Sequence, residues 1–269
     1  MKKILLILTL LYSSSSIMAE QTLTFGIVPQ QSASKLARLW IPIFTYINEQ
    51  SGLKIRFATA PDIPTFEKRL AAGEYDIAYM NPYHYVVYHD KTGYKALNKA
   101  RDKHIKGIIV VAKNSSITKL KDLDNTTLAF PSPAAFAASI LTRSDLKEHD
   151  VNFTPKYVSS HDSVYRTVAK GIYPGGGGIV RTLNNLEPEI RDQLKILWKT
   201  KGYTPHAIAV HPRMSKADAD KLQQALSGME QHKTGKGLLT GIKIKGFENA
   251  VNTDWDDVRK LQLKQLKDI

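Results

Sequence analysis

The feature that most constrains the fold is an early alternation of short apolar runs with longer segments of helical periodicity. Residues 22–28, 53–57 and 76–80 are apolar runs of strand length. Between them, apolar residues recur at helical spacing until Gly52 and Gly73, which are typical helix ends. Strands that alternate with helices pair in parallel, and the helices cover the sheet. The pattern therefore predicts an α/β fold built on a mostly parallel sheet.

Polar side chains stand where these strands end. Gln30 and Gln31 follow the first strand, and Tyr79 lies near the end of the third. Asn81 begins the next helix, which also carries Tyr85. Because ligands of open α/β sheets bind beyond the carboxyl ends of the strands, we expect these side chains to contact a ligand. The alternative is that the tyrosines form an amphipathic helix face at the water interface.

A second candidate binding feature covers residues 128–138. Residues 128–130 are an apolar run, Ser132 and Pro133 interrupt it, and helical spacing begins at Ala134. The first amides of a helix have no partner within it, and the helix dipole favours an anion there. Small residues allow a ligand to approach the backbone, or they simply let the helix pack closely on the sheet. The candidate ligand contacts are Ser132, Ala134, Ala135 and Phe136.

The later part of the chain adds one more polar helix start and a run of glycines. His161 lies where a strand near residues 156–158 passes into a helix, although a lone histidine also serves purely structural roles. Residues 175–178 are all glycine, which permits either close backbone approach or local mobility. Residues 217–229 and 254–266 are expected to form two basic amphipathic helices with solvated charged faces.

The first residues follow the order of a secretory signal peptide. Lys2 and Lys3 precede an apolar run over residues 4–11, and small residues then lead to Ala19. This run is too short to span a bilayer, and no later run approaches about 20 apolar residues. We expect residues 1–19 to be cleaved after export, leaving a soluble, monomeric periplasmic chain without a lipid anchor.

The composition favours anionic partners. The chain has 38 Lys and Arg against 25 Asp and Glu, and loss of Lys2 and Lys3 changes the formal charge from +13 to +11. The basic residues are scattered and no aromatic–basic motif occurs, which argues against nucleic acid as a partner. With no cysteine and no metal-ligand spacing among the histidines, we expect neither a metal nor a cofactor.

An ordered set of short motifs resembles one known family. The motifs are residues 25–29 (FGIVP), residues 75–78 (YDIA), the pattern over residues 115–123, Ala129-Phe130 with Pro133, and residues 160–162 (SHD). In this order they resemble the phosphate/phosphite/phosphonate substrate-binding proteins of ABC transporters, over roughly residues 22–229. The resemblance implies a two-lobed periplasmic binding protein of the type-II topology, with a mostly parallel sheet and flanking helices in each lobe.

The same resemblance suggests how the chain is divided. It implies a first lobe of residues 20–112 and 201–269 and a second lobe of residues 113–200. The chain would then cross between the lobes near Ala112 and near Thr200.

The family's ligand pocket carries over only in part. Where phosphonate-binding members have a Ser-Thr-Ser run, this chain has Ala135-Phe136-Ala137, so three hydroxyl donors are missing. The histidine that helps to hold the phosphonate is present as His161. Ile63 and Ile105 align with ligand-facing tyrosines, and Arg181 and His206 fall near carboxylates that meet an aminoalkyl group. Arg181 would disfavour an ammonium-bearing ligand and could bind a carboxylate or phosphate.

We therefore expect a solute-binding protein that captures a small anionic or polar ligand, such as a phosphonate, phosphate, another oxyanion or a carboxylate, and delivers it to an ABC permease. The alternative is a sensory accessory protein whose closed form docks on a membrane receptor, such as a histidine kinase or a cyclic-dinucleotide enzyme. Both functions use the same ligand-driven closure. We do not expect an enzyme, because adjacent Ser, His and Asp residues at 159–162 do not make a spatially convergent catalytic triad.

Overall fold

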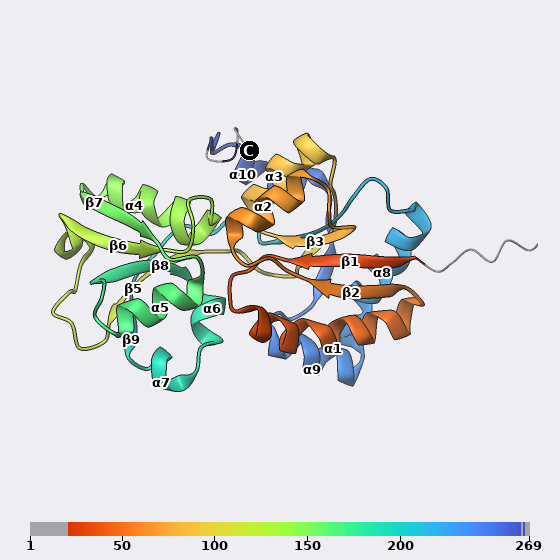
Figure 1. The fold of residues 1–269 in the computed structure, drawn as a ribbon, viewed down its shortest axis with the longest axis horizontal. Coiled ribbons are helices and arrows are strands. Elements are labelled where there is room, and N and C mark those ends of the chain that lie inside the picture. The colour runs from red at the N-terminus through yellow and green to blue at the C-terminus, as the bar shows by residue number, and fades with distance from the viewer. Residues whose placement is uncertain (1–20, 265, 267–269) are drawn as a thin grey trace, which may run out of the picture.

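The computed structural model describes residues 21–264 and 266, and it forms two α/β lobes that lie side by side (Figure 1). The predicted signal peptide, residues 1–19, lies outside the described residues. In the part of the chain that is described, no helix is long and apolar enough to cross a membrane.

The first lobe contains a six-stranded sheet. In spatial order its strands are β11 (Phe247–Asn249), β4 (Lys95–Ala100), β10 (Ala207–Val210), β3 (Ile77–Met80), β1 (Thr22–Ile27) and β2 (Lys54–Ala58). Its helices are α1 (Ala33–Ser51), α2 (Ile63–Ala71), α3 (Pro82–Thr92), α8 (Lys216–Gly228), α9 (Lys233–Gly241) and α10 (Asp256–Arg259). β1 pairs in parallel with β2 and β3, whereas β10 pairs antiparallel with β3 and β4.

The second lobe contains a five-stranded sheet. Its strands, in spatial order, are β7 (Phe153–Tyr157), β6 (Thr126–Phe130), β8 (Gly175–Ile179), β5 (Gly107–Ala112) and β9 (Leu194–Lys199). Its helices are a π-helix (Phe136–Leu141), α4 (Thr142–Glu148), α5 (His161–Ala169), α6 (Val180–Asn184) and α7 (Pro188–Arg191), with a 3-10 turn at Leu120–Leu123. The two-lobed α/β prediction is confirmed, and both sheets are mixed because β5 and β10 run against their neighbours.

Local sequence signals explain why the first helices form where they do. The side chain of Ser32 accepts a hydrogen bond from the amide of Lys35 and caps α1, and Gly52 ends the helix in the left-handed conformation. Asp62 caps α2 and Asn81 caps α3 in the same way, so each helix starts just beyond the end of a strand. These caps place the helix starts, and the polar residues beside them, along one edge of the first sheet.

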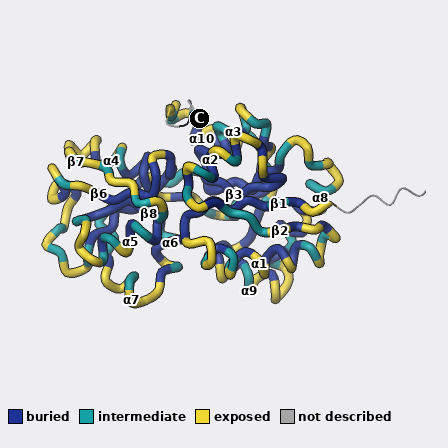
Figure 2. The backbone as a smooth tube through the Cα atoms, in the orientation of Figure 1, coloured by how far each residue is buried: buried dark blue, intermediate teal, exposed yellow. Residues whose placement is uncertain are grey.

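The core of the second lobe shows why its sheet is covered on both faces. In β5, Ile108 and Val110 pack into one apolar cluster, whereas Ile109 and Val111 pack into the other. Successive side chains of a strand point to opposite faces, so a strand that is apolar throughout must be buried on both sides. Figure 2 shows the central strands of both sheets buried, whereas the outer faces of the helices and the edge strand β7 carry exposed residues.

The assignment of β5 corrects the predicted lobe boundary at Ala112. β5 pairs with β8 and β9, so residues 107–112 belong to the second sheet and the first crossing lies between Ala100 and Gly107. The apolar run at residues 107–112 could be buried in the core of either lobe, so its sequence does not show which sheet it joins. Its pairing with β8 and β9 decides this. The two crossing segments run side by side, joined by reciprocal backbone hydrogen bonds between Ile105 and Tyr203 of 2.8 and 3.0 Å.

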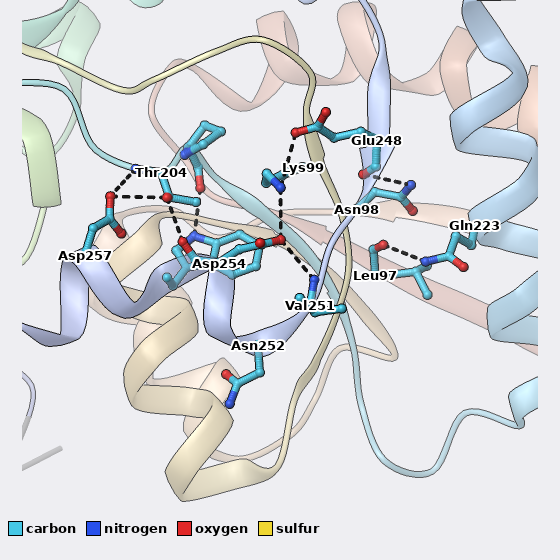
Figure 3. A network of polar contacts seen from close by, with 12 residues as sticks. Leu97, Asn98, Lys99, Thr204, Gln223, Glu248, Val251, Asn252, Asp254 and Asp257 are labelled. Atoms are coloured by element: carbon cyan, nitrogen blue, oxygen red, sulfur yellow. Dashed lines mark hydrogen bonds and ion pairs between the residues drawn. The ribbon is translucent and has the colours of Figure 1, made fainter.

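A polar network anchors these crossing segments to the first lobe (Figure 3). The ammonium group of Lys99, near the end of β4, contacts Asp254 at 2.9 Å and Glu248 at 3.2 Å. The amide and hydroxyl of Thr204, on the second crossing, bond to the carboxylate of Asp257 and to the carbonyl of Asp254. The C-terminal segment therefore fastens both crossings at their first-lobe ends.

Candidate functional site

Two neighbouring cavities lie between the lobes, beside the crossing segments. The larger one, here called the hinge-side cavity, has a volume of about 250 Å³. It is lined by Tyr79, Ala100, Lys103, His104, Ile105, Lys106, Ile179, Val180, Arg181, Pro205, His206 and Ile244. The smaller one, here called the helix-start cavity, has a volume of about 10 Å³. It is lined by Val28, Gln30, Ile63, Asn81, Ile105, Ala135, Phe136, Ala137, Ala138, His161, Ile179 and His206.

Two stacked rings and a guanidinium group line the hinge-side cavity. The rings of Tyr79 and His206 stack at 4.9 Å with 18° between their planes, and the guanidinium of Arg181 lies 5.7 Å from the centre of the Tyr79 ring. Burial, followed by the positive charge of Arg181, lowers the pKa of His206 well below its ordinary value, so its imidazole is neutral. Among the described residues, Nε2 of His206 has no hydrogen-bond partner although it is buried.

His161 joins the two lobes at the helix-start cavity. Its amide donates a hydrogen bond to the carbonyl of Gln30 at 3.0 Å, and Arg181 donates to the side-chain oxygen of the same glutamine. Burial and the nearby guanidinium of Arg181 lower the pKa of His161 to about 3. Its Nδ1 lies 3.2 Å from the hydroxyl of Thr182, which leaves Nε2 as the nitrogen available to a ligand.

The predicted helix start at residues 134–136 is closed against the first lobe. The side-chain amide of Asn81 donates to the carbonyl of Ala134 at 3.2 Å, and the ring of Phe136 meets Tyr203 edge-on at 5.6 Å. The amide of Ala135 turns back to the carbonyl of Ser132 at 3.3 Å. The space left beside this turn is about that of one water molecule, so in this closed arrangement it is too small for a tetrahedral oxyanion.

The glycine run of β8 explains how the π-helix comes so close to the sheet. A Cβ on Gly177 would lie 1.9 Å from the carbonyl oxygen of Ala138, and one on Gly107 of β5 would lie 2.2 Å from that of Ala137. Of the two explanations that the sequence left open, close backbone approach is the one that the structure supports. Side chains are excluded here because backbone atoms fill the space they would need.

The hinge-side cavity is cationic. Arg181 contributes a permanent positive charge and Lys103 a titratable one, and His104 and Lys106 also line the cavity. None of the described residues that line it is Asp or Glu. Burial and repulsion from Arg181 lower the pKa of Lys103 to about 8. Lys103 also donates a hydrogen bond to the carbonyl of Lys243. A cavity with this charge can hold an anion and would repel an ammonium group.

The family assignment follows from the length of the match. A family model described as "ABC transporter, phosphonate, periplasmic substrate-binding protein" matches residues 25–255. The chain belongs to this family. It is thus the non-enzymatic substrate-binding component of an ABC transporter for phosphonate or phosphate-like solutes. In the described part of the chain, no group of three or more His, Asp or Glu residues is arranged to hold a metal ion.

One curated protein and two solved structures with related descriptions are similar to this chain. The chain is 22% identical to the phosphate-import protein PhnD of Mycolicibacterium smegmatis over 89% of this chain and 84% of that protein. A binding component of an ABC phosphonate transporter from Pseudomonas aeruginosa shares the fold, with a TM-score of 0.83, 17% identity and coverage of 92% of this chain and 87% of that one. PhnD1 from Prochlorococcus marinus, solved with methylphosphonate, has a TM-score of 0.79, 18% identity and coverage of 91% and 99%.

Most of the residues predicted for the site of this phosphonate-binding family member gather around the two cavities. The structure brings together seven of the lining side chains named from the sequence: Tyr79, Asn81, Ala135, Phe136, His161, Arg181 and His206. Ala134 lies beside them through its bond to Asn81. Ile63 and Ile105, aligned with ligand-facing tyrosines, also line the helix-start cavity.

Three predicted contacts lie elsewhere. Tyr85 points to the C-terminal segment, where its hydroxyl donates to Asn252 at 3.0 Å and its ring lies 4.4 Å from Trp255, so it lines neither cavity. The side-chain amide of Gln31 donates a long hydrogen bond, 3.5 Å, to the carboxylate of Asp162 in the other lobe. Ser132 is buried within its turn and lines neither cavity. The prediction for Tyr85 came from the start of its helix beyond a strand end, and the local pattern does not reveal its neighbour in the C-terminal segment because that segment is distant in sequence.

Sequence reasoning missed the residues of the first crossing. Lys103 and Lys106 contribute to the cationic lining because the chain leaves β4 and passes along the cavity before it enters β5. The basic run at residues 101–106 was a usable signal, since a charged segment directly before an apolar strand marks an exposed connection.

Proposed function

We propose that this protein captures a small phosphorus oxyanion, a phosphonate or phosphate, in the hinge-side cavity and delivers it to an ABC permease. The observation that carries the proposal is the charge of the cavity: Arg181 and Lys103 face a space lined by no carboxylate among the described residues. The charges of guanidinium and ammonium groups remain strong in such a partly desolvated space and can offset the cost of stripping water from an anion.

The relatives support the same class of ligand. The structure from P. marinus holds methylphosphonate, and the relative from M. smegmatis is described as a phosphate-import protein. Neutral His206 fits this class because its ring offers one N–H as a donor to an oxyanion oxygen in the hinge-side cavity. This donor stands in for hydroxyl donors that are absent at residues 135–137.

The contacts between the lobes supply a means of closure. Gln30 of the first lobe accepts hydrogen bonds from Arg181 and from the amide of His161, both in the second lobe. Lys35 and Glu187 form a further ion pair across the lobes at 3.7 Å. A ligand that contacts Arg181 and Tyr79 together would bind the closed form more tightly than the open form, and the permease would recognise that closed form.

The proposal includes export and a monomeric state. The first 19 residues would direct the chain to the periplasm and be removed after Ala19, which mass spectrometry of the exported chain would test. Each copy contains both cavities in full, so a single chain suffices for binding. Light scattering of the purified protein would show whether it is a monomer.

The substitution Arg181→Gln tests the ligand site. Removing one charge-assisted contact costs about 1.5–3 kcal/mol, which corresponds to roughly 10- to 150-fold weaker binding of methylphosphonate in calorimetry. Arg191→Gln is the matched control: it removes a guanidinium that pairs with Asp192 on the surface of the same lobe, and it should leave the affinity unchanged. Undiminished binding in the Arg181 variant, with an unchanged melting temperature, would contradict the proposed site.

A further inference from the structure

The walls of the hinge-side cavity are more apolar than a simple oxyanion needs. Six of the lining residues are apolar: Ala100, Ile105, Ile179, Val180, Pro205 and Ile244. All of them except Val180 are buried in the closed arrangement. They come from β4, from both crossing segments, from the junction of β8 and α6, and from the loop after α9, so both lobes contribute apolar surface.

The polar groups of the cavity, in contrast, stand close together. Arg181 lies over the ring of Tyr79, and Tyr79 stacks on His206. Arg181, Lys103 and His206 all line the hinge-side cavity, so the three groups surround one common space. Nε2 of His206 is buried without a partner among the described residues, so this nitrogen remains available to bond with a ligand in the cavity that His206 lines.

The volume of the hinge-side cavity distinguishes an inorganic oxyanion from a larger organic ligand. A cavity of about 150 Å³ lined by apolar side chains holds a benzene molecule, and the hinge-side cavity measures about 250 Å³. An inorganic phosphate fills only part of that volume and gains nothing from the apolar walls. A ligand with one charged end and one aryl-sized apolar end would meet the cationic groups and the apolar walls together.

We propose that the preferred ligand is an organophosphonate with an apolar substituent about the size of a benzyl group. Its phosphonate lies at Arg181, Lys103 and His206, and its substituent lies against Ile105, Ile179 and the other apolar walls. This inference rests on the proposed function and adds the chemical class of the substituent. Burial of an aromatic group in an apolar cavity adds affinity in proportion to the area removed from water.

The first measurement compares benzylphosphonate, methylphosphonate and inorganic phosphate by calorimetry on the mature protein. We expect benzylphosphonate to bind at least tenfold more tightly than methylphosphonate, and phosphate to bind most weakly. Phenylacetate is included because it keeps the aryl group and changes the acid.

A variant that fills the cavity tests where the substituent lies. Ala100→Leu adds three carbon atoms to the cavity wall, and it should reduce the affinity ratio of benzylphosphonate to methylphosphonate from at least ten to near one. Ala96→Leu makes the same change on the same strand outside the cavity lining and should preserve the ratio. Val180→Phe repeats the test from the second lobe if the strand tolerates leucine poorly.

The outcomes separate the inference from the function on which it rests. Equal affinity for methylphosphonate and benzylphosphonate, or a preference for phosphate, contradicts the proposal that the ligand carries an apolar substituent. Either result is still consistent with capture of a phosphorus oxyanion. Binding of phenylacetate without any phosphonate binding supports the apolar end and overturns the phosphorus ligand. Binding of none of the four compounds overturns both, and an Ala100→Leu variant that keeps the full ratio overturns the assigned position.

Discussion

Substitution of Gly177 by alanine tests how closely the π-helix must approach the second sheet. The new Cβ would lie 1.9 Å from the carbonyl oxygen of Ala138, about 1.4 Å short of the roughly 3.3 Å at which carbon and oxygen normally meet. The ring of Phe130 would lie 2.8 Å away on the other side. Neither neighbour is the free end of a flexible side chain, so the backbone of the helix start must shift.

The cost of this shift should exceed ordinary overpacking. Extra methylene groups in a packed core typically cost 1–3 kcal/mol, and a clash with backbone should cost about 3 kcal/mol or more. For a chain of this size, each kcal/mol lowers the melting temperature by about 2–4 °C, so we expect a decrease of roughly 6–12 °C in scanning fluorimetry. Methylphosphonate binding should weaken as well, because the displaced helix start lines the helix-start cavity, which shares Ile105, Ile179 and His206 with the hinge-side cavity.

A second glycine provides the control. Gly228 ends α8 with φ −80°, and a Cβ there would meet nothing within 4 Å. Gly228→Ala should therefore stabilise the protein by about 0.4–1 kcal/mol by restricting the unfolded chain. A melting temperature of Gly177→Ala within about 2 °C of the unchanged protein would refute the close-approach argument, since ~1.4 Å of overlap with backbone cannot be absorbed at so small a cost.

Two further predictions concern the polar groups of the site. Thr182→Val removes the hydroxyl beside Nδ1 of His161, so the tautomer of His161 seen by ¹⁵N NMR should change. An unaltered tautomer would contradict the positioning role of Thr182. The pKa of Lys103 is lowered to about 8, so its ammonium is present below pH 8 and lost above it. We therefore compare the methylphosphonate affinity of the unchanged protein with that of Lys103→Met, and the ratio should fall about fivefold from pH 7 to pH 9. Both proteins are measured at the same pH, so the ionisation of the ligand affects them equally.

Much of the fold could be predicted because its signals are local. The caps Asp62 and Asn81 and the terminators Gly52 and Gly73 mark helix ends within a few residues of the strands they follow, and the structure contains those helices. The helix expected at 217–229 is present as α8 (Lys216–Gly228). Such elements are recognisable because capping groups and apolar periodicity depend on neighbours within one or two helical turns.

Elements that depend on distant partners were harder to predict. The helix expected over residues 254–266 is wrong: among the residues of this stretch that the structure describes, only a 3-10 turn at Asn252–Trp255 and α10 at Asp256–Arg259 form. β4, with the sequence KALNKA, has no strand pattern of its own and forms because β10 and β11 pair with both of its edges. The two lysines and the weak apolar periodicity of this segment do not predict that it pairs with strands far away in the sequence.

The sequence by itself determined the alternation of strands and helices and the family resemblance, because each is encoded in short contiguous segments. Only the tertiary structure decided that β5 joins the second sheet, that the glycine run allows close backbone approach, and that the cationic groups meet beside the crossing segments. Lys103, Arg181 and His206 lie on separate segments, and their meeting depends on strand pairing and lobe closure. These are contacts between residues far apart in the chain, which no local pattern specifies.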